Sequence, residues 1–297
     1  METVYAIRGQ TVKNTLLKEN LQKRNVRIVN NPIIDSKYKT IERRLLSIFQ
    51  DEMSKKESAI VRYSPEIISK AAMFLSGMIP RSAALGIAGE TASGKSTVTF
   101  DIIETLELFS KEFEIKNIVT RVNTDDYYYD RSEMVKAAGG MANFSKTYDF
   151  DVPEALELSL MKKHIKELLD GNPVMLPEYD MSGTTIRRDN VKPAFPAKMI
   201  ISEGLFTLTE DIRDAFDFKL YVHVNHDIQK ERFFIRANER GLGEGAKAIY
   251  ENALNKAKIY IRPAFETADI VIDGNADRKQ YKDFLNKILS MVQEVSL

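Results

Sequence analysis

Short apolar runs separated by polar stretches organise this sequence, and their spacing alternates between that of strands and that of helices. The run Ala-Ala-Leu-Gly-Ile-Ala at 83–88 has the unbroken apolar character of a buried parallel strand. A helical pattern begins directly after it, at 97–103. The same two patterns recur along the chain, with extended runs at 115–122, 174–176, 199–201, 218–224 and 270–272 and helical spacing at 153–169, 228–238 and 277–292. Strands that alternate with helices predict an α/β fold of three layers, in which helices cover both faces of a mostly parallel sheet.

The first 80 residues precede this alternation and are predicted to be a partly helical N-terminal extension ahead of a domain at 81–297. Apolar residues have helical spacing at 41–49 and 65–78, and Pro65 stands where a helix accepts proline, at its first position. No motif in the extension indicates its role.

Composition indicates a soluble globular protein, since 43% of the 297 residues are hydrophobic and 29% are charged. No apolar run approaches the ~18 residues that span a bilayer, and the N-terminus lacks the pattern of a secretory signal. Cysteine is absent, which excludes disulfides and thiolate chemistry. The net charge is zero, so no overall field favours nucleic acid. We therefore expect a cytoplasmic protein with neither a membrane nor a nucleic-acid partner.

The segment Gly89-Glu-Thr-Ala-Ser-Gly-Lys-Ser96 fits the phosphate-binding pattern G-x-x-x-x-G-K-[ST] at every fixed position. Its two glycines let the backbone bend so that N–H groups point at phosphate oxygens. Lys95 brings positive charge to the β and γ phosphates, and the Ser96 hydroxyl is suited to Mg²⁺. The residues predicted to bind ATP phosphates here are Gly89, Ala92, Ser93, Gly94, Lys95, Ser96 and Thr97.

A carboxylate, Asp125, follows the second predicted strand of the domain, at the sheet edge that carries the phosphate loop. A kinase for a small alcohol needs such a carboxylate to accept the hydroxyl proton during transfer of the γ-phosphoryl group. The loop alone would also suit a GTPase or a motor, so Asp125 is what favours a kinase.

Five further segments, in the same order along the chain, resemble the uridine kinase and phosphoribulokinase family over about 83–275. They are Asp125-Asp126-Tyr127-Tyr128, Asp151-Val152-Pro153-Glu154-Ala155, Pro177-Glu178-Tyr179-Asp180 with Arg187 and Arg188 downstream, Ile200-Ile201-Ser202-Glu203-Gly204-Leu205-Phe206, and Arg232 and Arg236 with Glu239-Arg240-Gly241. The resemblance implies a P-loop kinase fold, ATP and Mg²⁺ as cofactors, and a small-molecule hydroxyl acceptor as partner. Kinases of this family are often oligomers, so it also allows a homo-oligomer.

The resemblance also implies roles for single residues. Asp125 is the general base, assisted by Lys95, and Ser96, Glu203 and Asp125 are the candidate ligands of Mg²⁺. The predicted acceptor-binding residues are Tyr128, Asp151, Tyr179 and Arg187. Arg232, Arg236 and Arg240 are spaced four residues apart on one helical face, where they would bind the triphosphate as part of a mobile lid.

Three departures from the family fall on acceptor or lid positions. The loop at 181–186 lacks the histidine with which uridine and cytidine kinases contact the base, Val152 replaces a histidine, and Leu242 replaces an arginine. A uridine or cytidine kinase-like enzyme remains the favoured interpretation. Alternatives are a pantothenate kinase-like enzyme, since Thr124-Asp125-Asp126-Tyr127 and Thr147-Tyr148-Asp149 resemble elements of that family, and a kinase for a sugar phosphate.

A non-catalytic ATP-binding sensor or assembly module is an alternative of another class. Its interface would be the first fifty residues, which carry ten basic and four acidic residues. A solvated helical face is the simpler explanation of that excess, because no aromatic-rich basic motif accompanies it. The presence of Asp125, Glu203, Lys95 and Ser96 together favours an active enzyme.

Overall fold

The computed structural model describes residues 17, 19, 21, 26–29 and 31–296. The start of the predicted extension lies outside the described residues, and so do five of the ten basic residues of the first fifty, Arg8, Lys13, Lys18, Lys23 and Arg24.

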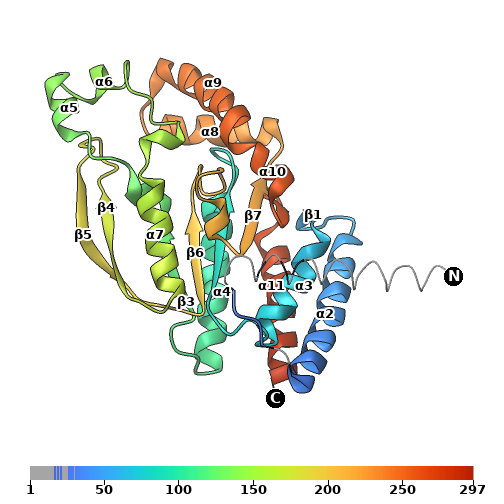
Figure 1. Cartoon of the computed structure of the whole chain (residues 1–297). Helices are drawn as coiled ribbons and strands as arrows, with labels where there is room; N and C mark the ends of the chain where they lie inside the picture. The colour runs from blue at the N-terminus through green and yellow to red at the C-terminus, as the bar shows by residue number, and fades with distance from the viewer. Residues whose placement is uncertain (1–16, 18, 20, 22–25, 30, 297) are drawn as a thin grey trace.

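A six-stranded sheet in the order β1-β8-β7-β2-β6-β3 forms the centre of the molecule (Figure 1). β2 pairs in parallel with β6 and β7, β3 pairs in parallel with β6, and β8 in parallel with β7. Only β1, at one edge, runs antiparallel to its neighbour β8. The strands are β1 (Ile60–Tyr63), β2 (Ala83–Ala88), β3 (Val119–Asn123), β6 (Met199–Glu203), β7 (Phe218–His223) and β8 (Ile270–Asp273). This sheet confirms the predicted mostly parallel α/β fold.

Helices cover both faces of the sheet, as the alternating pattern predicts. On one face, Val98 of α4 (Lys95–Glu112) and Tyr281 of α11 (Arg278–Ser296) share a buried cluster with Ile87 of β2. On the other face, Met161 of α7 (Leu158–Leu169) is buried in one cluster with Ala84 of β2. Side chains of one strand therefore contribute to both helical layers.

The remaining elements surround this core. They are α2 (Pro32–Met53), α3 (Pro65–Leu75), η1 (Thr124–Tyr127), α5 (Ser132–Ala137), α6 (Met141–Phe144), η2 (Pro153–Ala155), η3 (Arg213–Ala215), α8 (His226–Glu239), η4 (Gly243–Gly245), α9 (Ala246–Lys256), a π-helical turn η5 (Ala257–Ile261) and α10 (Pro263–Thr267). Among the described residues, no helix is both long and apolar enough to cross a membrane.

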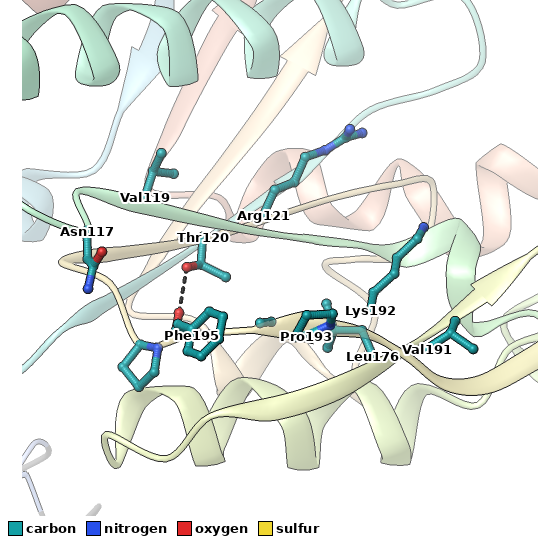
Figure 2. Close-up of a pocket in the computed structure, with 11 residues that line it drawn as sticks. Asn117, Val119, Thr120, Arg121, Leu176, Val191, Lys192, Pro193 and Phe195 are labelled. Carbon is teal, nitrogen blue, oxygen red and sulfur yellow. Dashed lines mark hydrogen bonds between the residues drawn. The ribbon is translucent and has the colours of Figure 1, made fainter.

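A separate antiparallel hairpin, β4 (Val174–Tyr179) with β5 (Arg187–Ala194), lies beside the edge strand β3. The Thr120 hydroxyl on β3 donates to the Phe195 carbonyl at 2.6 Å, just beyond the end of β5. A cavity of about 590 Å³ separates the hairpin from β3 next to this bond (Figure 2). The pattern predicts β4 only in part and does not predict β5, so the hairpin is new information from the structure.

Residues of the predicted extension share a core with the rest of the chain. Phe49 of α2 makes edge-to-face contacts with Tyr63 of β1 and Phe284 of α11, each at 5.0 Å between ring centroids. β1 itself extends the central sheet. α2 and α3 therefore form a small helical layer against α11, at the sheet edge opposite the hairpin (Figure 1).

We expect Phe49→Ala to destabilise the whole protein by about 3–5 kcal/mol, the usual cost of removing a buried aromatic side chain. Phe49 is 3% exposed and joins three elements. Urea unfolding followed by circular dichroism measures the effect. Ile33→Ala is the matched control, because Ile33 lies on the same helix and is 81% exposed. A loss below 1 kcal/mol in Phe49→Ala would show that the helical layer adds little to stability.

Candidate active site

The phosphate loop connects β2 to α4 at the carboxyl edge of the parallel sheet. Ala92 and Gly94 adopt left-handed backbone angles, with φ of 59° and 93°. A Cβ at Gly89 would lie 2.6 Å from Ser93 Oγ and 2.7 Å from the Val222 carbonyl oxygen, so only glycine fits there. The helix begins at Lys95, two residues before the predicted start, and its N-terminus faces the loop. This bent backbone, held at a helix N-terminus, fits the phosphates of ATP.

The loop after β8 packs against the phosphate loop. A Cβ at Gly274 would lie 2.0 Å from the Ser93 carbonyl oxygen, and the Gly274 N–H donates to the His223 carbonyl. The two loops are therefore in direct backbone contact.

We expect Gly274→Ala to weaken ATP binding and to lower the free energy of unfolding by about 1–3 kcal/mol, because a backbone must shift to admit the new methyl group. Titration calorimetry with ATP and urea unfolding measure the two effects. Gly245→Ala serves as control, since no atom lies within 4 Å of a Cβ built there. Unchanged ATP affinity in Gly274→Ala would mean that the phosphate loop does not depend on this contact.

Ser96 and Glu203, the two predicted magnesium ligands at strand and helix ends, lie in contact. The Ser96 hydroxyl donates to Glu203 Oε1 at 2.7 Å, and the Glu203 side chain at the end of β6 is 6% exposed. Arg121 of β3 donates to the other carboxylate oxygen at 3.1 Å. Among the described residues, no cluster of three or more His, Cys, Asp or Glu could hold a metal ion alone. One carboxylate and one hydroxyl fit Mg²⁺, which usually keeps several waters and binds substrate phosphates.

Lys95 and Asp125 lie close enough to Glu203 and to each other for these charges to act on the pKa of both groups. Burial lowers the pKa of Lys95, and the carboxylates of Glu203 and Asp125 partly offset that effect. Burial raises the pKa of Asp125, while Lys95 acts in the opposite direction. A carboxylate with a raised pKa is a better proton acceptor near neutral pH than an exposed one. The structure thus brings the predicted base, the phosphate-loop lysine and the metal ligands together.

The three arginines of α8 lie at different distances from this centre. Arg232 donates to the Gly274 carbonyl at 2.9 Å and to Asn275 Oδ1 at 3.2 Å, beside Gly94. The Arg236 guanidinium is near enough to Lys95 to lower its pKa. Arg240 is exposed at the C-cap of the helix. Their binding to the triphosphate stays a prediction.

The two predicted acceptor-site tyrosines pack against each other, with ring centroids 5.3 Å apart for Tyr128 and Tyr179. Phe150 meets the Tyr128 ring edge-on at 6.2 Å, and Tyr148 meets Phe150 at 4.7 Å. Burial raises the pKa of Tyr179 to about 12, so its hydroxyl stays protonated. These rings form an aromatic wall beside Asp125, because Asp125 lies in η1 and Tyr128 is the C-cap residue of that turn, with its N–H 3.5 Å from the Asp125 carbonyl oxygen.

Asp151 and Arg187 already have protein partners. Asn252 of α9 lies 3.5 Å from Asp151 Oδ2, and burial raises the pKa of Asp151. Arg187 pairs with Glu157 and Asp189, at 2.9 Å each, and is largely buried. A role for either in acceptor binding remains a prediction.

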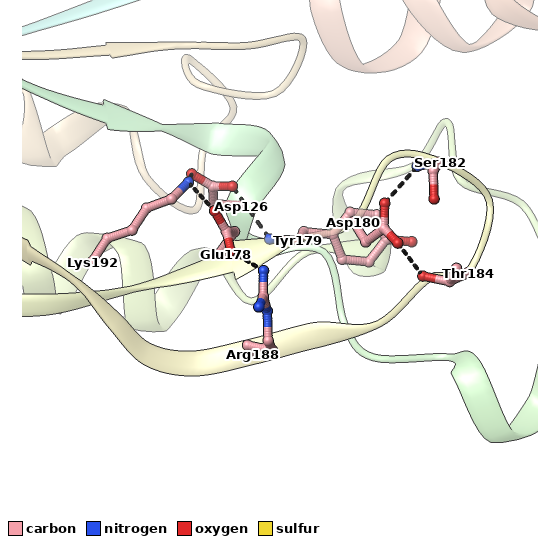
Figure 3. Close-up of polar contacts among 8 residues, drawn as sticks. All are labelled: Asp126, Glu178, Tyr179, Asp180, Ser182, Thr184, Arg188 and Lys192. Carbon is pink, nitrogen blue, oxygen red and sulfur yellow. Dashed lines mark hydrogen bonds and ion pairs between the residues drawn. The ribbon is translucent and has the colours of Figure 1, made fainter.

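The loop between β4 and β5, which lacks the expected histidine, is closed on itself. Asp180 accepts hydrogen bonds from the Ser182 N–H at 2.8 Å and from the Thr184 hydroxyl at 2.6 Å (Figure 3). The Arg131 N–H donates to the Thr185 carbonyl at 3.2 Å. This compact turn lies next to the acceptor-site aromatics through Tyr179.

Sequence reasoning missed several residues that shape the site. Glu90, at a variable position of the phosphate loop, accepts two hydrogen bonds from Arg262, at 2.9 and 3.2 Å. Arg121 pairs with the carboxylate of Glu203, the predicted metal ligand. Arg121 had one usable signal, a charged residue two positions before the end of a strand that leads into the site. Nothing in the local sequence pairs Glu90 with Arg262, which lies 172 residues away.

The sheet order, the phosphate loop and the neighbouring carboxylates define the chain as a P-loop phosphotransferase. The model of the phosphoribulokinase / uridine kinase family matches residues 84–280. A uridine kinase of Staphylococcus haemolyticus is 31% identical over 217 residues, which cover 71% of this chain and 97% of that protein. Uridine-cytidine kinase 2-B of Danio rerio is 29% identical over 71% of this chain and 79% of its own length.

The chain belongs to the phosphoribulokinase / uridine kinase family and is an ATP-dependent kinase for a small molecule. Among solved structures, a D-glycerate 3-kinase of Cryptococcus neoformans is similar with a TM-score of 0.48 and 11% identity, covering 84% of this chain and 98% of that one. The family match and the uridine kinase relatives confirm the predicted family and enzyme class.

Proposed function

We propose that this enzyme transfers the γ-phosphate of ATP, with Mg²⁺, to a hydroxyl of uridine or cytidine. The observation that carries this proposal is that Asp125, Lys95 and the Ser96–Glu203 pair lie together. The aromatic wall of Tyr128 and Tyr179 lies next to Asp125, the proposed general base. The relatives named as uridine kinases support a pyrimidine nucleoside as acceptor. The planar pyrimidine ring of such a nucleoside fits an aromatic wall because ring faces stack favourably.

Each residue has a defined task in this proposal. Asp125 accepts the proton of the attacking hydroxyl, and Lys95 stabilises negative charge on the transferring phosphoryl group. Ser96 and Glu203 would hold Mg²⁺, which would supply positive charge to offset that of the ATP phosphates. Arg236 adds a second cation from the lid helix next to Lys95. Asp151 accepts hydrogen bonds from the hydroxyl groups of the sugar and so positions the acceptor.

ADP release from Mg·ATP, measured with uridine, cytidine, pantothenate, ribulose 5-phosphate and no acceptor, tests the proposal. Strong stimulation by uridine or cytidine is the expected result, and product analysis should show a nucleoside monophosphate. Stimulation by pantothenate or ribulose 5-phosphate alone would show that the enzyme acts on another class of acceptor. No stimulation, with ATP still bound, would favour a non-catalytic ATP-binding module.

A further inference from the structure

Asp126, the residue next to the proposed base Asp125, points toward the β4–β5 hairpin. Asp126 is buried, with 8% of the residue exposed. Asp126 Oδ1 accepts the backbone N–H of Tyr179 at 3.3 Å, and Oδ2 accepts the Lys192 ammonium of β5 at 3.2 Å (Figure 3). One carboxylate therefore contacts both strands of the hairpin.

These two contacts join the turn that carries the base to the hairpin. Among the described residues, they are the only hydrogen bonds between η1 and the hairpin. The hairpin also packs apolar side chains into the main core, including Leu176 and Ala194, so its folding does not depend on Lys192. The Lys192–Asp126 contact instead joins β5 directly to η1. It acts beside two hydrogen bonds that join the residues after η1 to the hairpin, from the Arg131 N–H to the Thr185 carbonyl and from the Arg187 N–H to Asp130 Oδ2.

The cavity beside β3 leaves room for the hairpin to shift. Its lining includes Arg121 and Thr120 from β3 and Lys192, Pro193 and Phe195 from the hairpin side (Figure 2). The Thr120–Phe195 hydrogen bond closes one end of this cavity. Lys192 lies toward the other end, where it contacts Asp126, the neighbour of the proposed base Asp125. Without Lys192, no side chain of β5 would bond to η1.

We propose that Lys192 is a positioning residue, which holds Asp126 and Tyr179 so that the base Asp125 and the acceptor wall keep their mutual geometry. The inference rests on the proposed function, because it assumes that Asp125 is the base. Glu178, 3.5 Å from Lys192 and paired with Arg188, is a second carboxylate that attracts the ammonium. A small displacement of reacting groups costs up to about 100-fold in rate, so a single tether matters.

The test compares Lys192→Met with Lys192→Arg and with the control Lys162→Met. Lys162 is matched to Lys192, since their side chains are 42% and 43% exposed and each pairs with an aspartate, but Lys162 lies on α7 and pairs with Asp214. Amide hydrogen exchange of 124–129 and 174–196 reports whether the tether holds. Steady-state kinetics reports whether the tether serves catalysis.

Lys192→Met is expected to speed exchange in both segments, to lower kcat about tenfold and to raise the acceptor KM, with the KM for Mg·ATP unchanged. Lys192→Arg should restore most of both properties, and Lys162→Met should resemble the wild type. Wild-type exchange and acceptor kinetics in Lys192→Met would overturn the inference, as would a change no larger than that of Lys162→Met. If the wild type phosphorylates no acceptor, the proposed function fails, and the exchange measurement still decides whether the tether exists.

Discussion

Asp125→Asn is expected to lower kcat by about 10²–10⁴-fold while ATP binding stays near that of the wild type. Asparagine keeps the size of the side chain and loses the ability to accept a proton. Asp125 is close enough to Lys95 and Glu203 to affect charge at the phosphate site, yet the backbone cradle of the phosphate loop does not involve it. The loss should therefore fall on the chemical step.

Single-turnover transfer and titration calorimetry with ATP separate these two effects. Asp170→Asn is the control, because Asp170 is an exposed aspartate at the end of α7. Equal rates of acceptor-dependent ADP formation in wild type and Asp125→Asn would exclude Asp125 as the base. An equally large loss of ATP affinity would make it a nucleotide-binding residue instead.

The inner strands β2 and β6 of the central sheet are predictable from sequence because they are buried on both faces. The runs at 83–88 and 199–201 are continuous and apolar, and the structure places both in adjacent strands, β2 and β6. β5 gives no such signal, since Arg-Arg-Asp-Asn-Val-Lys-Pro-Ala has neither an apolar run nor alternation, and most of its residues are exposed. The hairpin is held by tertiary contacts, among them the hydrogen bonds of Asp126. Such contacts produce no periodic pattern in the sequence.

The residues of the candidate site also divide into those that the sequence predicts and those that it does not. The phosphate loop is predictable because its residues are consecutive, and Glu203 because it ends an apolar strand. Arg121 and Lys192 are not, since each acts through a carboxylate 82 or 66 residues away along the chain. Charged pairs of that kind depend on strand order, and a single sequence gives strand order only through a family resemblance.

Strand order also explains why the predicted base, Asp125, and the predicted metal ligand, Glu203, lie at the same sheet edge. β3 and β6 are parallel neighbours, and their register pairs Asn123 with Glu203 at the carboxyl ends. Asp125 follows two residues later in η1, so both carboxylates arrive at one edge of the sheet. β2 pairs with β6 on the other side and delivers the phosphate loop to the same edge. The two-carboxylate centre is therefore a consequence of sheet topology.

Lys95→Ala is expected to abolish most transfer, with kcat lowered by at least about 10²–10³-fold, the usual effect of removing one group that stabilises transition-state charge. Binding should weaken more for ATP than for ADP, because the lysine reaches the β and γ phosphates. Lys111→Ala is the control on the same helix, since Lys111 is exposed in its last turn. An unchanged kcat would contradict the assigned role.

Stability should respond to Lys95→Ala in the opposite direction from activity. Burial lowers the pKa of Lys95 despite the attraction of Glu203 and Asp125, which means that the folded state disfavours the charged form. Removing the ammonium removes that cost, so the apo variant should unfold at the same temperature as the wild type or above it. Functional groups are often retained at such a cost to stability. Differential scanning calorimetry without nucleotide measures this, and a Tm several degrees below that of the wild type would show that Lys95 holds the fold together by pairing with the two carboxylates.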